Sequence, residues 1–235
     1  MFCFDEAVRY SEIGPDGLMT LPSVLDLLQD CCAFQSEELG IGLSYLNQEH
    51  KAWVLSFWQV IVDRYPRLGE QLRICTWPYD FKGFMGYRNF KIETSAGEVI
   101  VYANSIWTFM DTKSGHPVRL SDEVRGRYEM DPPYEMDCAG RKIRLPEDME
   151  RQESIRVGRS HIDTNQHVNN CKYVMMAEEY LPPDYKVKEL RVEYRRAAVL
   201  GDTIYPQIKK DGKTFFASLE NKADEPYAII EFMEG

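Results

Sequence analysis

The sequence predicts an α+β protein in which two similar units each place a long helix against an antiparallel sheet. Three observations lead to this prediction. Apolar residues recur at helical spacing from Leu21 to about Leu39, strand-like runs rich in Val, Ile, Trp and Phe follow, and the same order returns in the second half. A helix and a sheet each carry an apolar face, so packing them together buries both faces.

The first half begins with a strand-like segment, 2–10, and a turn at Gly14-Pro15-Asp16-Gly17. Thr20 is a suitable N-cap for the helix that follows, and Pro22 fits the first turn of that helix. Turn residues then separate a series of strand-like runs. We predict strands at 52–65, 71–77, 86–93 and 99–110, and a short helical segment at 121–127.

The second half repeats this order with a strand, a polar loop, a helix and further strands. The predicted segments are a strand at 155–159, a loop at 160–169, a helix at 170–180 and strands at 187–196, 203–209, 214–221 and 226–233. Residues 60–70 also align with residues 192–202, because both end in Leu-Gly followed by an acid. We therefore predict an internal duplication, with an N-terminal unit at 1–130, a linker at 131–150 and a C-terminal unit at 151–235.

The composition limits the classes of protein that the chain can belong to. Its 235 residues, of which 44% are hydrophobic, are enough for two domains. No apolar run approaches the roughly 20 residues that span a bilayer, and Asp5 and Glu6 interrupt the start of the chain. The six cysteines form no C-x-x-C pair and no metal-ligand spacing. We expect a cytoplasmic protein with six free thiols, no membrane span and no bound metal.

The net charge of −10 argues against a nucleic acid partner, because phosphates require a basic surface. An acidic protein partner would likewise need a local basic patch that overrides the overall charge.

The densest polar cluster of the chain spans residues 160–170, where the predicted loop meets the helix. Asp163, Asn165 and His167 alternate, so in an extended loop their side chains would face one site. Asn169 or Asn170 then caps the helix, whose N-terminus presents unpaired N–H groups and the positive end of its dipole. Such a helix start can stabilise a developing oxyanion.

Residues 163–173, DTNQHVNNCKY, resemble the active-site loop of a known family, the acyl-acyl-carrier-protein (acyl-ACP) thioesterases of plants and bacteria, which reads D-x-N-x-H-V-N-N-x-x-Y. Residues 53–77 resemble a strand pair of its first domain, with V-D-R-Y-P and a closing T-W. Residues 192–196, VEYRR, resemble its L-E-Y-R-R. The matches run from about residue 53 to 202.

The resemblance implies a tandem hotdog fold, in which each sheet wraps a helix, with catalysis in the second domain and no cofactor. It implies that Asp163, Asn165 and His167 form the catalytic set. The sequence departs from the plant members where Ala197-Ala198 stand in place of their Glu-Cys. A cysteine nucleophile at that position is therefore not available.

We accordingly expect water to attack a fatty acyl-ACP thioester directly and release the free fatty acid. Asp163 or His167 would be the general base, Asn165 would orient the water or the carboxylate, and Glu193 is a reserve carboxylate. The expected oxyanion donors are the main-chain amides at the helix start: Val168, Asn169 and Asn170. Cys171 has no neighbour that would activate a thiolate, so we expect it to be structural.

The expected partners are the fatty acyl chain and acyl carrier protein. The acyl chain would lie in an apolar groove of the first unit, near 25–34, Trp53, Phe57 and Trp107. The acidic carrier would bind one of three basic groups: Arg64 and Arg67; Arg141, Lys142 and Arg144; or, preferred for its proximity to the catalytic loop, Lys186, Lys188, Arg191, Arg195 and Arg196. A tandem chain supplies its own pair of domains, so both a monomer and a homodimer fit.

Three other functions fit the same sequence. An acyl-CoA thioesterase of the same fold performs the same chemistry on another carrier. A hotdog dehydratase also uses an Asp–His pair, although the D-x-N-x-H-V-N-N context favours a thioesterase. A non-catalytic acyl-binding module would explain Ala197-Ala198 but leaves the polar loop without a purpose.

Overall fold

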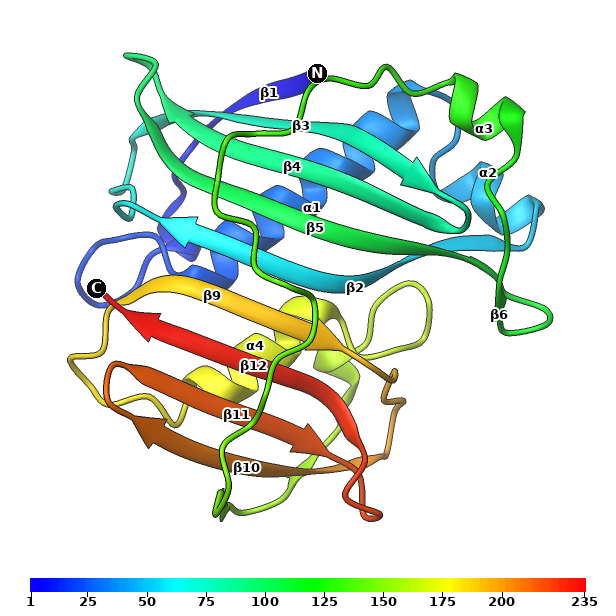
Figure 1. Ribbon diagram of the computed structural model, residues 1–235. Helices are drawn as coiled ribbons and strands as arrows, with labels where there is room; N and C mark the ends of the chain where they lie inside the picture. Colours follow the sequence, from blue (N-terminus) through cyan, green and yellow to red (C-terminus); the bar gives the residue numbers. More distant parts are fainter. The chain divides into compact units, whose positions relative to one another are not determined.

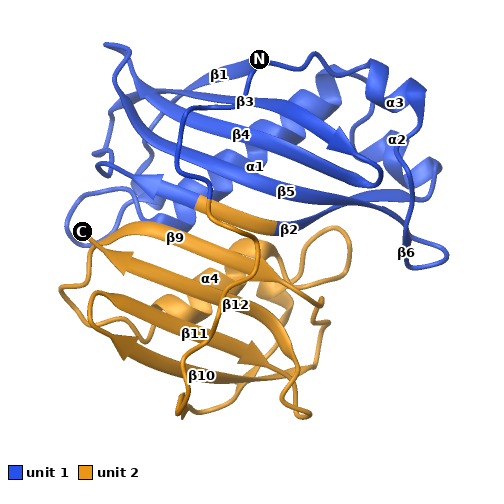
Figure 2. Cartoon of the chain, in the orientation of Figure 1, with its two compact units in different colours: residues 1–56, 60–138 blue, residues 57–59, 139–235 orange.

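The computed structural model describes residues 1–235, and the chain divides into two compact units (Figure 2). Unit 1 comprises residues 1–56 and 60–138, and unit 2 comprises residues 57–59 and 139–235. In each unit a helix packs against an antiparallel sheet (Figure 1), so the predicted α+β class is confirmed. No helix is both long enough and apolar enough to cross a bilayer.

The sheet of unit 1 has the strand order β1-β3-β4-β5-β2, and β6 pairs with the end of β5. Its strands are β1 (Phe2–Ala7), β2 (Lys51–Val62), β3 (Gln71–Lys82), β4 (Met85–Thr94), β5 (Val99–Asp111) and β6 (His116–Pro117). Its helices are the short 3₁₀ turn η1 (Tyr10–Glu12), α1 (Leu21–Glu38), α2 (Leu43–Gln48) and α3 (Asp122–Gly126). The sequence reasoning missed α2, because six residues are too few to show a helical period.

Helix α1 forms where its capping residue and apolar spacing predict it. The Thr20 hydroxyl accepts a hydrogen bond from the Ser23 N–H at 3.3 Å, and Pro22 lies in the first turn. Val24 and Leu28 are fully buried on one face of the helix. That face packs on the sheet, mainly on β3.

The sheet of unit 2 has the strand order β9-β12-β11-β10-β7, and β8 pairs with another part of β10. Its strands are β7 (Glu150–Arg151), β8 (Ile155–Arg156), β9 (Val187–Tyr194), β10 (Thr203–Asp211), β11 (Thr214–Glu220) and β12 (Pro226–Glu234). The 3₁₀ turn η2 (Arg159–His161) precedes α4 (Asn170–Glu178), which packs on β11 and β12. The expected strand at 155–159 is thus only two residues long, and η2 begins at Arg159.

Equivalent hydrogen bonds support the alignment of residues 60–70 with 192–202. In unit 1 the Gly69 N–H donates to the Val8 carbonyl at 2.9 Å; in unit 2 the Gly201 N–H donates to the Val157 carbonyl at 3.1 Å. The acid that follows each glycine repeats the pattern. The carboxylate of Glu70 accepts the Arg67 N–H, and that of Asp202 accepts the Val199 N–H, both at 3.0 Å.

The expectation of six free thiols is wrong, because Cys3 and Cys75 form a disulfide. These residues lie directly opposite each other on the antiparallel strands β1 and β3. They are 72 residues apart in the sequence, so only the strand pairing brings them together. The other four cysteines are not part of a disulfide, and Cys171 is buried in α4, as a structural residue would be.

Candidate active site

The polar loop of unit 2 is a tight turn between η2 and α4. The Asp163 N–H donates to the His167 carbonyl at 2.8 Å, and the Gln166 N–H donates to the Asp163 carbonyl at 3.1 Å. Gln166 has a positive φ of 63°, a backbone conformation that residues other than glycine seldom adopt. The expected extended loop is therefore wrong, and the turn rather than alternation brings Asp163, Asn165 and His167 together.

The carboxylate of Asp163 holds the turn from inside. Its Oδ1 accepts the Asn165 N–H at 2.8 Å and the His167 N–H at 3.2 Å. Side-chain acceptance of nearby main-chain N–H groups is a general way for aspartate to stabilise turns. Asp163 thus fixes the backbone that carries the other two polar side chains.

Asn165 and His167 are both exposed, and no side chain of the protein hydrogen-bonds the carboxamide or the imidazole. Their donors and acceptors are therefore accessible to a ligand. A neutral imidazole has one nitrogen that accepts a proton, while a carboxamide provides two N–H donors and one acceptor. One turn thus presents a proton acceptor and a polar donor within two residues of each other.

Asn169 is the N-cap of α4, which settles the choice between Asn169 and Asn170. Its Oδ1 accepts the Cys171 N–H at 2.8 Å, and its carbonyl accepts the Lys172 N–H at 2.9 Å. This cap places the positive end of the helix dipole directly after the turn.

Two of the three expected oxyanion donors are occupied within the protein. The Val168 N–H donates to the Ala198 carbonyl at 2.9 Å, and the Asn169 N–H donates to the His161 carbonyl at 2.9 Å. Both bonds attach the turn to its neighbours: the first to the segment after β9, the second to η2. The amides of Val168 and Asn169 therefore serve the structure of the turn, and Asn170 is the member of the trio that begins the helix.

Sequence reasoning missed two tyrosines that bind the main chain around α4. The N–H of Ala198 donates to the Tyr173 hydroxyl oxygen at 2.8 Å, and the Tyr194 hydroxyl donates to the Asn170 carbonyl at 3.0 Å. Burial raises the pKa of Tyr173 to about 12 and that of Tyr194 well above its ordinary value, so both phenols keep their protons. Sequence reasoning could have found them, because Tyr173 ends the D-x-N-x-H-V-N-N-x-x-Y segment and Tyr194 lies in the V-E-Y-R-R segment.

The reserve carboxylate, Glu193, is buried and engaged. Its Oε2 accepts the Ile143 N–H at 3.1 Å, and its Oε1 accepts the Arg195 Nε–H at 3.1 Å. The Glu193 carboxylate on β9 therefore holds the segment around Ile143 and the Arg195 side chain in place. Nothing in these contacts directs the carboxylate toward the turn.

The preferred basic group is largely neutralised by neighbouring acids. Arg191 pairs with Glu231 at 2.5 Å, Arg195 with Glu193 at 3.1 Å and Arg196 with Glu225 at 2.7 Å. The remaining two members, Lys186 and Lys188, are exposed.

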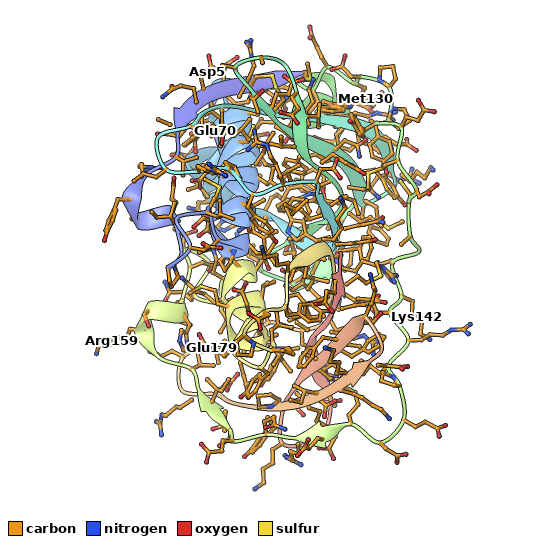
Figure 3. The ribbon with its side chains drawn as sticks, turned by 90° about the vertical axis from the view of Figure 1, so that its left-hand side faces the viewer. Asp5, Glu70, Met130, Lys142, Arg159 and Glu179 are labelled. Atoms are coloured by element: carbon orange, nitrogen blue, oxygen red, sulfur yellow. A yellow bond between two sulfur atoms is a disulfide. The ribbon has the colours of Figure 1, made fainter.

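The other two basic groups differ in their surroundings. Arg64 pairs with Glu70 at 2.6 Å, so the first group is also partly neutralised. Figure 3 shows Lys142, from the second group, on the opposite side of unit 2 from Arg159, which begins the 3₁₀ turn before the candidate loop. Lys142 therefore lies away from that turn.

Unit 1 contains a small cavity of about 20 Å³. Trp53 and Trp107 line it as expected, together with Phe81, Tyr128 and the buried Arg88. Cys32 is the lining residue from the predicted 25–34 segment, whereas Phe57 belongs to the buried core. A cavity of this size holds about one water molecule, so an acyl chain would require these aromatic side chains to move.

Comparisons with known proteins agree with the resemblance in the sequence. The family described as acyl-ACP thioesterase N-terminal domain matches residues 4–128, and its C-terminal domain matches residues 145–231. The palmitoyl-acyl carrier protein thioesterase of Cuphea hookeriana is 31% identical over 210 residues, which are 81% of this chain and 50% of that protein. The dodecanoyl-[acyl-carrier-protein] hydrolase of Cinnamomum camphora is 26% identical over 91% of this chain and 60% of its own length.

Solved structures share the fold over nearly the whole chain. An acyl-ACP thioesterase from Bacteroides thetaiotaomicron VPI-5482 has a TM-score of 0.90 at 19% identity, covering 99% of this chain and 97% of the other. The 12:0-ACP thioesterase from Umbellularia californica has a TM-score of 0.87 at 21% identity, covering 99% and 96%. The tandem hotdog fold is therefore confirmed.

The chain belongs to the acyl-ACP thioesterase family, because the two family domains together match most of its residues. It spans about half the length of the curated relatives it matches.

Proposed function

We propose that this protein hydrolyses the thioester of a fatty acyl-acyl carrier protein and releases the free fatty acid. The observation that carries the proposal is the Asp163–His167 turn, which presents an exposed imidazole and carboxamide at the start of α4. Membership of a family whose relatives are named acyl-ACP hydrolases supports the choice of substrate.

In the proposed reaction a water molecule attacks the thioester carbonyl carbon, and His167 accepts the proton of that water. His167 suits the role of base because its side chain is exposed and has no partner within the protein. Asp163 acts mainly by holding the turn, since its Oδ1 already accepts two N–H groups. This division of roles leaves Asp163 as the alternative base through its second oxygen.

The negative charge on the carbonyl oxygen is stabilised by the Asn165 carboxamide and the positive end of α4. The carbon–sulfur bond then breaks, and the leaving thiolate takes the proton from His167. The products are the free fatty acid and the carrier protein with its thiol restored. No step requires a cofactor or a cysteine nucleophile, so Ala197-Ala198 are compatible with the reaction.

Lys186 and Lys188 are the proposed contacts for the acidic carrier, because both are exposed cationic residues of the preferred basic group. The distal part of the acyl chain is proposed to enter the aromatic cavity of unit 1, with movement of Trp53 or Trp107. The binding of the acidic carrier to the two lysines should weaken at high salt, because salt screens the charges.

The test is thioester hydrolysis across a panel of acyl-ACP and acyl-CoA substrates, with Asp163→Ala and His167→Ala beside the wild-type protein. We expect the wild type to prefer acyl-ACP. His167→Ala should lower kcat by about 10²–10⁴-fold, the usual contribution of a general base.

Asp16→Ala provides a matched control within the chain. Asp16 holds the corresponding turn of unit 1, where its Oδ1 accepts the Leu18 N–H at 3.0 Å. Its removal should leave kcat unchanged. Equal hydrolysis of acyl-CoA would assign the protein to that carrier, and a well-folded wild type that hydrolyses neither substrate would refute the proposal.

A further inference from the structure

We infer that Tyr173 is a positioning residue, whose hydroxyl fixes the main-chain segment that holds the catalytic turn in place. The inference rests on the proposed function, because it concerns the turn that carries His167. Tyr173 lies on α4 with 2% of its surface exposed, so it acts from beneath the turn rather than on the substrate.

Two hydrogen bonds connect the tyrosine to the turn through a single residue. The buried Ala198 donates its N–H to the Tyr173 hydroxyl oxygen at 2.8 Å. The carbonyl of the same Ala198 accepts the Val168 N–H at 2.9 Å. Val168 follows His167 directly, so the position of the Ala198 peptide determines where the turn ends.

Unit 1 offers an internal comparison in which this connection is absent. The residue equivalent to Ala198 is Pro66, whose carbonyl accepts the Met19 N–H at 2.8 Å as the Ala198 carbonyl accepts that of Val168. Proline has no N–H, and the residue equivalent to Tyr173 is the apolar Val24. The tyrosine therefore occurs in the unit whose alanine needs an acceptor, and whose turn carries the polar side chains.

The second tyrosine, Tyr194, is likewise present in unit 2 and absent from the equivalent position of unit 1. The Tyr194 hydroxyl donates to the Asn170 carbonyl at 3.0 Å, at the start of α4. Its equivalent in unit 1 is Val62, which has no hydrogen-bonding side chain. Both hydroxyls thus bind the main chain around the proposed catalytic turn, and neither has a counterpart beneath the turn of unit 1.

Removing the Tyr173 hydroxyl would leave the buried Ala198 N–H without an acceptor. The peptide would then shift toward water or another acceptor, and its carbonyl would move with it. A displacement of about 1 Å at a catalytic group lowers the rate by about 100-fold. The effect should appear in kcat rather than KM, because no part of Tyr173 is proposed to contact the substrate.

The experiment compares Tyr173→Phe with the double variant Tyr173→Phe/Ala198→Pro. Proline removes the donor that has lost its acceptor, and Pro66 shows that this position accepts proline while keeping its carbonyl bond. We expect Tyr173→Phe to lower kcat at least about tenfold with KM within about twofold. The double variant should recover kcat to within about threefold of the wild type.

Tyr185→Phe is the matched control. The Tyr185 hydroxyl binds the carbonyls of Lys213 and Phe232, so its loss also removes hydrogen bonds between a tyrosine and the main chain of unit 2. It should lower Tm without changing kcat. If Tyr173→Phe behaves in the same way, the inference is overturned. If the double variant does not recover, the hydroxyl acts by another route and the positioning role is also refuted.

Hydrogen exchange at the Val168 amide separates this inference from the proposed function, because it needs no substrate. Exchange should be faster in Tyr173→Phe by about tenfold and return toward the wild-type rate in the double variant. Unchanged exchange would overturn the inference even if the enzyme is active. A wild type without thioesterase activity would instead refute the function and leave the exchange result to decide the role of Tyr173.

Discussion

The turn before α1 in unit 1 and the turn before α4 in unit 2 have the same backbone and different chemistry. The Gly14 N–H donates to the Leu18 carbonyl at 2.8 Å, as the Asp163 N–H donates to the His167 carbonyl at 2.8 Å. The five residues of the first turn are Gly-Pro-Asp-Gly-Leu, and those of the second are Asp-Thr-Asn-Gln-His. The shared backbone is therefore a property of the duplicated unit, whereas the candidate catalytic groups are a property of unit 2.

The comparison also shows where the polar turn departs from the favoured backbone. Both turns require a positive φ at their fourth residue, where unit 1 has Gly17 at 75° and unit 2 has Gln166 at 63°. Glycine adopts this conformation readily, whereas a side chain makes it less favourable by about 1 kcal/mol or more. The turn of unit 2 thus keeps a strained residue that the turn of unit 1 avoids.

Transplanting the turn of unit 1 into unit 2 should produce the largest effect. The changes are Asp163→Gly, Thr164→Pro, Asn165→Asp, Gln166→Gly and His167→Leu. Because the backbone hydrogen bonds recur in both units, we expect the protein to fold with an unchanged circular dichroism spectrum. Its acyl-ACP hydrolysis should fall by about 10³-fold or more, since the base and the carboxamide are both removed.

The reverse transplant into residues 14–18 of unit 1 is the control for this experiment. It should leave the rate of the native site unchanged within about twofold, as expected for a change that removes no catalytic group. A folded unit 2 transplant that keeps its activity would show that the chemistry lies elsewhere in the chain.

Glu178 should have the next largest effect, through the pH dependence of stability. Burial, together with the neighbouring Glu179, raises the pKa of Glu178 from 4.5 to about 7. The folded protein therefore holds this proton more tightly than the unfolded chain, and the free energy of unfolding falls as the pH rises from about 4.5 to about 7. The equivalent residue of α1 is the neutral Gln29.

Glu178→Gln should accordingly remove this loss and raise the free energy of unfolding at pH 8 by about 1–2 kcal/mol, a range that allows for the partial exposure of the carboxyl. Urea unfolding at pH 5 and pH 8 measures the difference. Glu179→Gln, at the exposed neighbour, should change stability by less than about 0.5 kcal/mol. Parallel pH profiles for Glu178→Gln and the wild type would show that Glu178 titrates normally.

The smallest effect should come from the fourth residue of each turn. Gln166→Gly should raise the free energy of unfolding by up to about 1 kcal/mol, because glycine relieves the positive φ. Gly17→Gln should lower it by a similar amount. Both are measurable by urea unfolding, and opposite signs for the two changes would be the expected result. If Gln166→Gly instead destabilises the protein, the glutamine side chain stabilises the fold by more than its positive φ destabilises it.

The order of the elements was predictable because the helical and strand periods are local properties of the sequence. Thr20 and Pro22 marked the start of α1, and the D-x-N-x-H string identified the turn that carries the candidate site. The shape of that turn was not predictable from alternation, because the Asp163 carboxylate folds the backbone around itself.

The parts that the sequence did not reveal depend on contacts between distant segments. Arg191 meets Glu231 only because β9 pairs with β12, and Ala198 meets Tyr173 only through the packing of α4. These contacts neutralise a basic residue that looked available, and they identify a tyrosine that looked like an ordinary core residue. Neither the ion pair nor the hydrogen bond could be predicted from residue type and spacing.

The Cys3–Cys75 disulfide makes a closed covalent loop of the chain between these residues, which contains α1, α2 and β2. A single cut by a protease inside this loop, for example after the exposed Arg67, breaks one peptide bond but separates nothing. The oxidised protein would still migrate as one species of full mass, and only a reductant would release the two fragments. A full-length band on a gel run without reductant therefore does not show that the polypeptide is uncut, because the disulfide alone can hold the two fragments together.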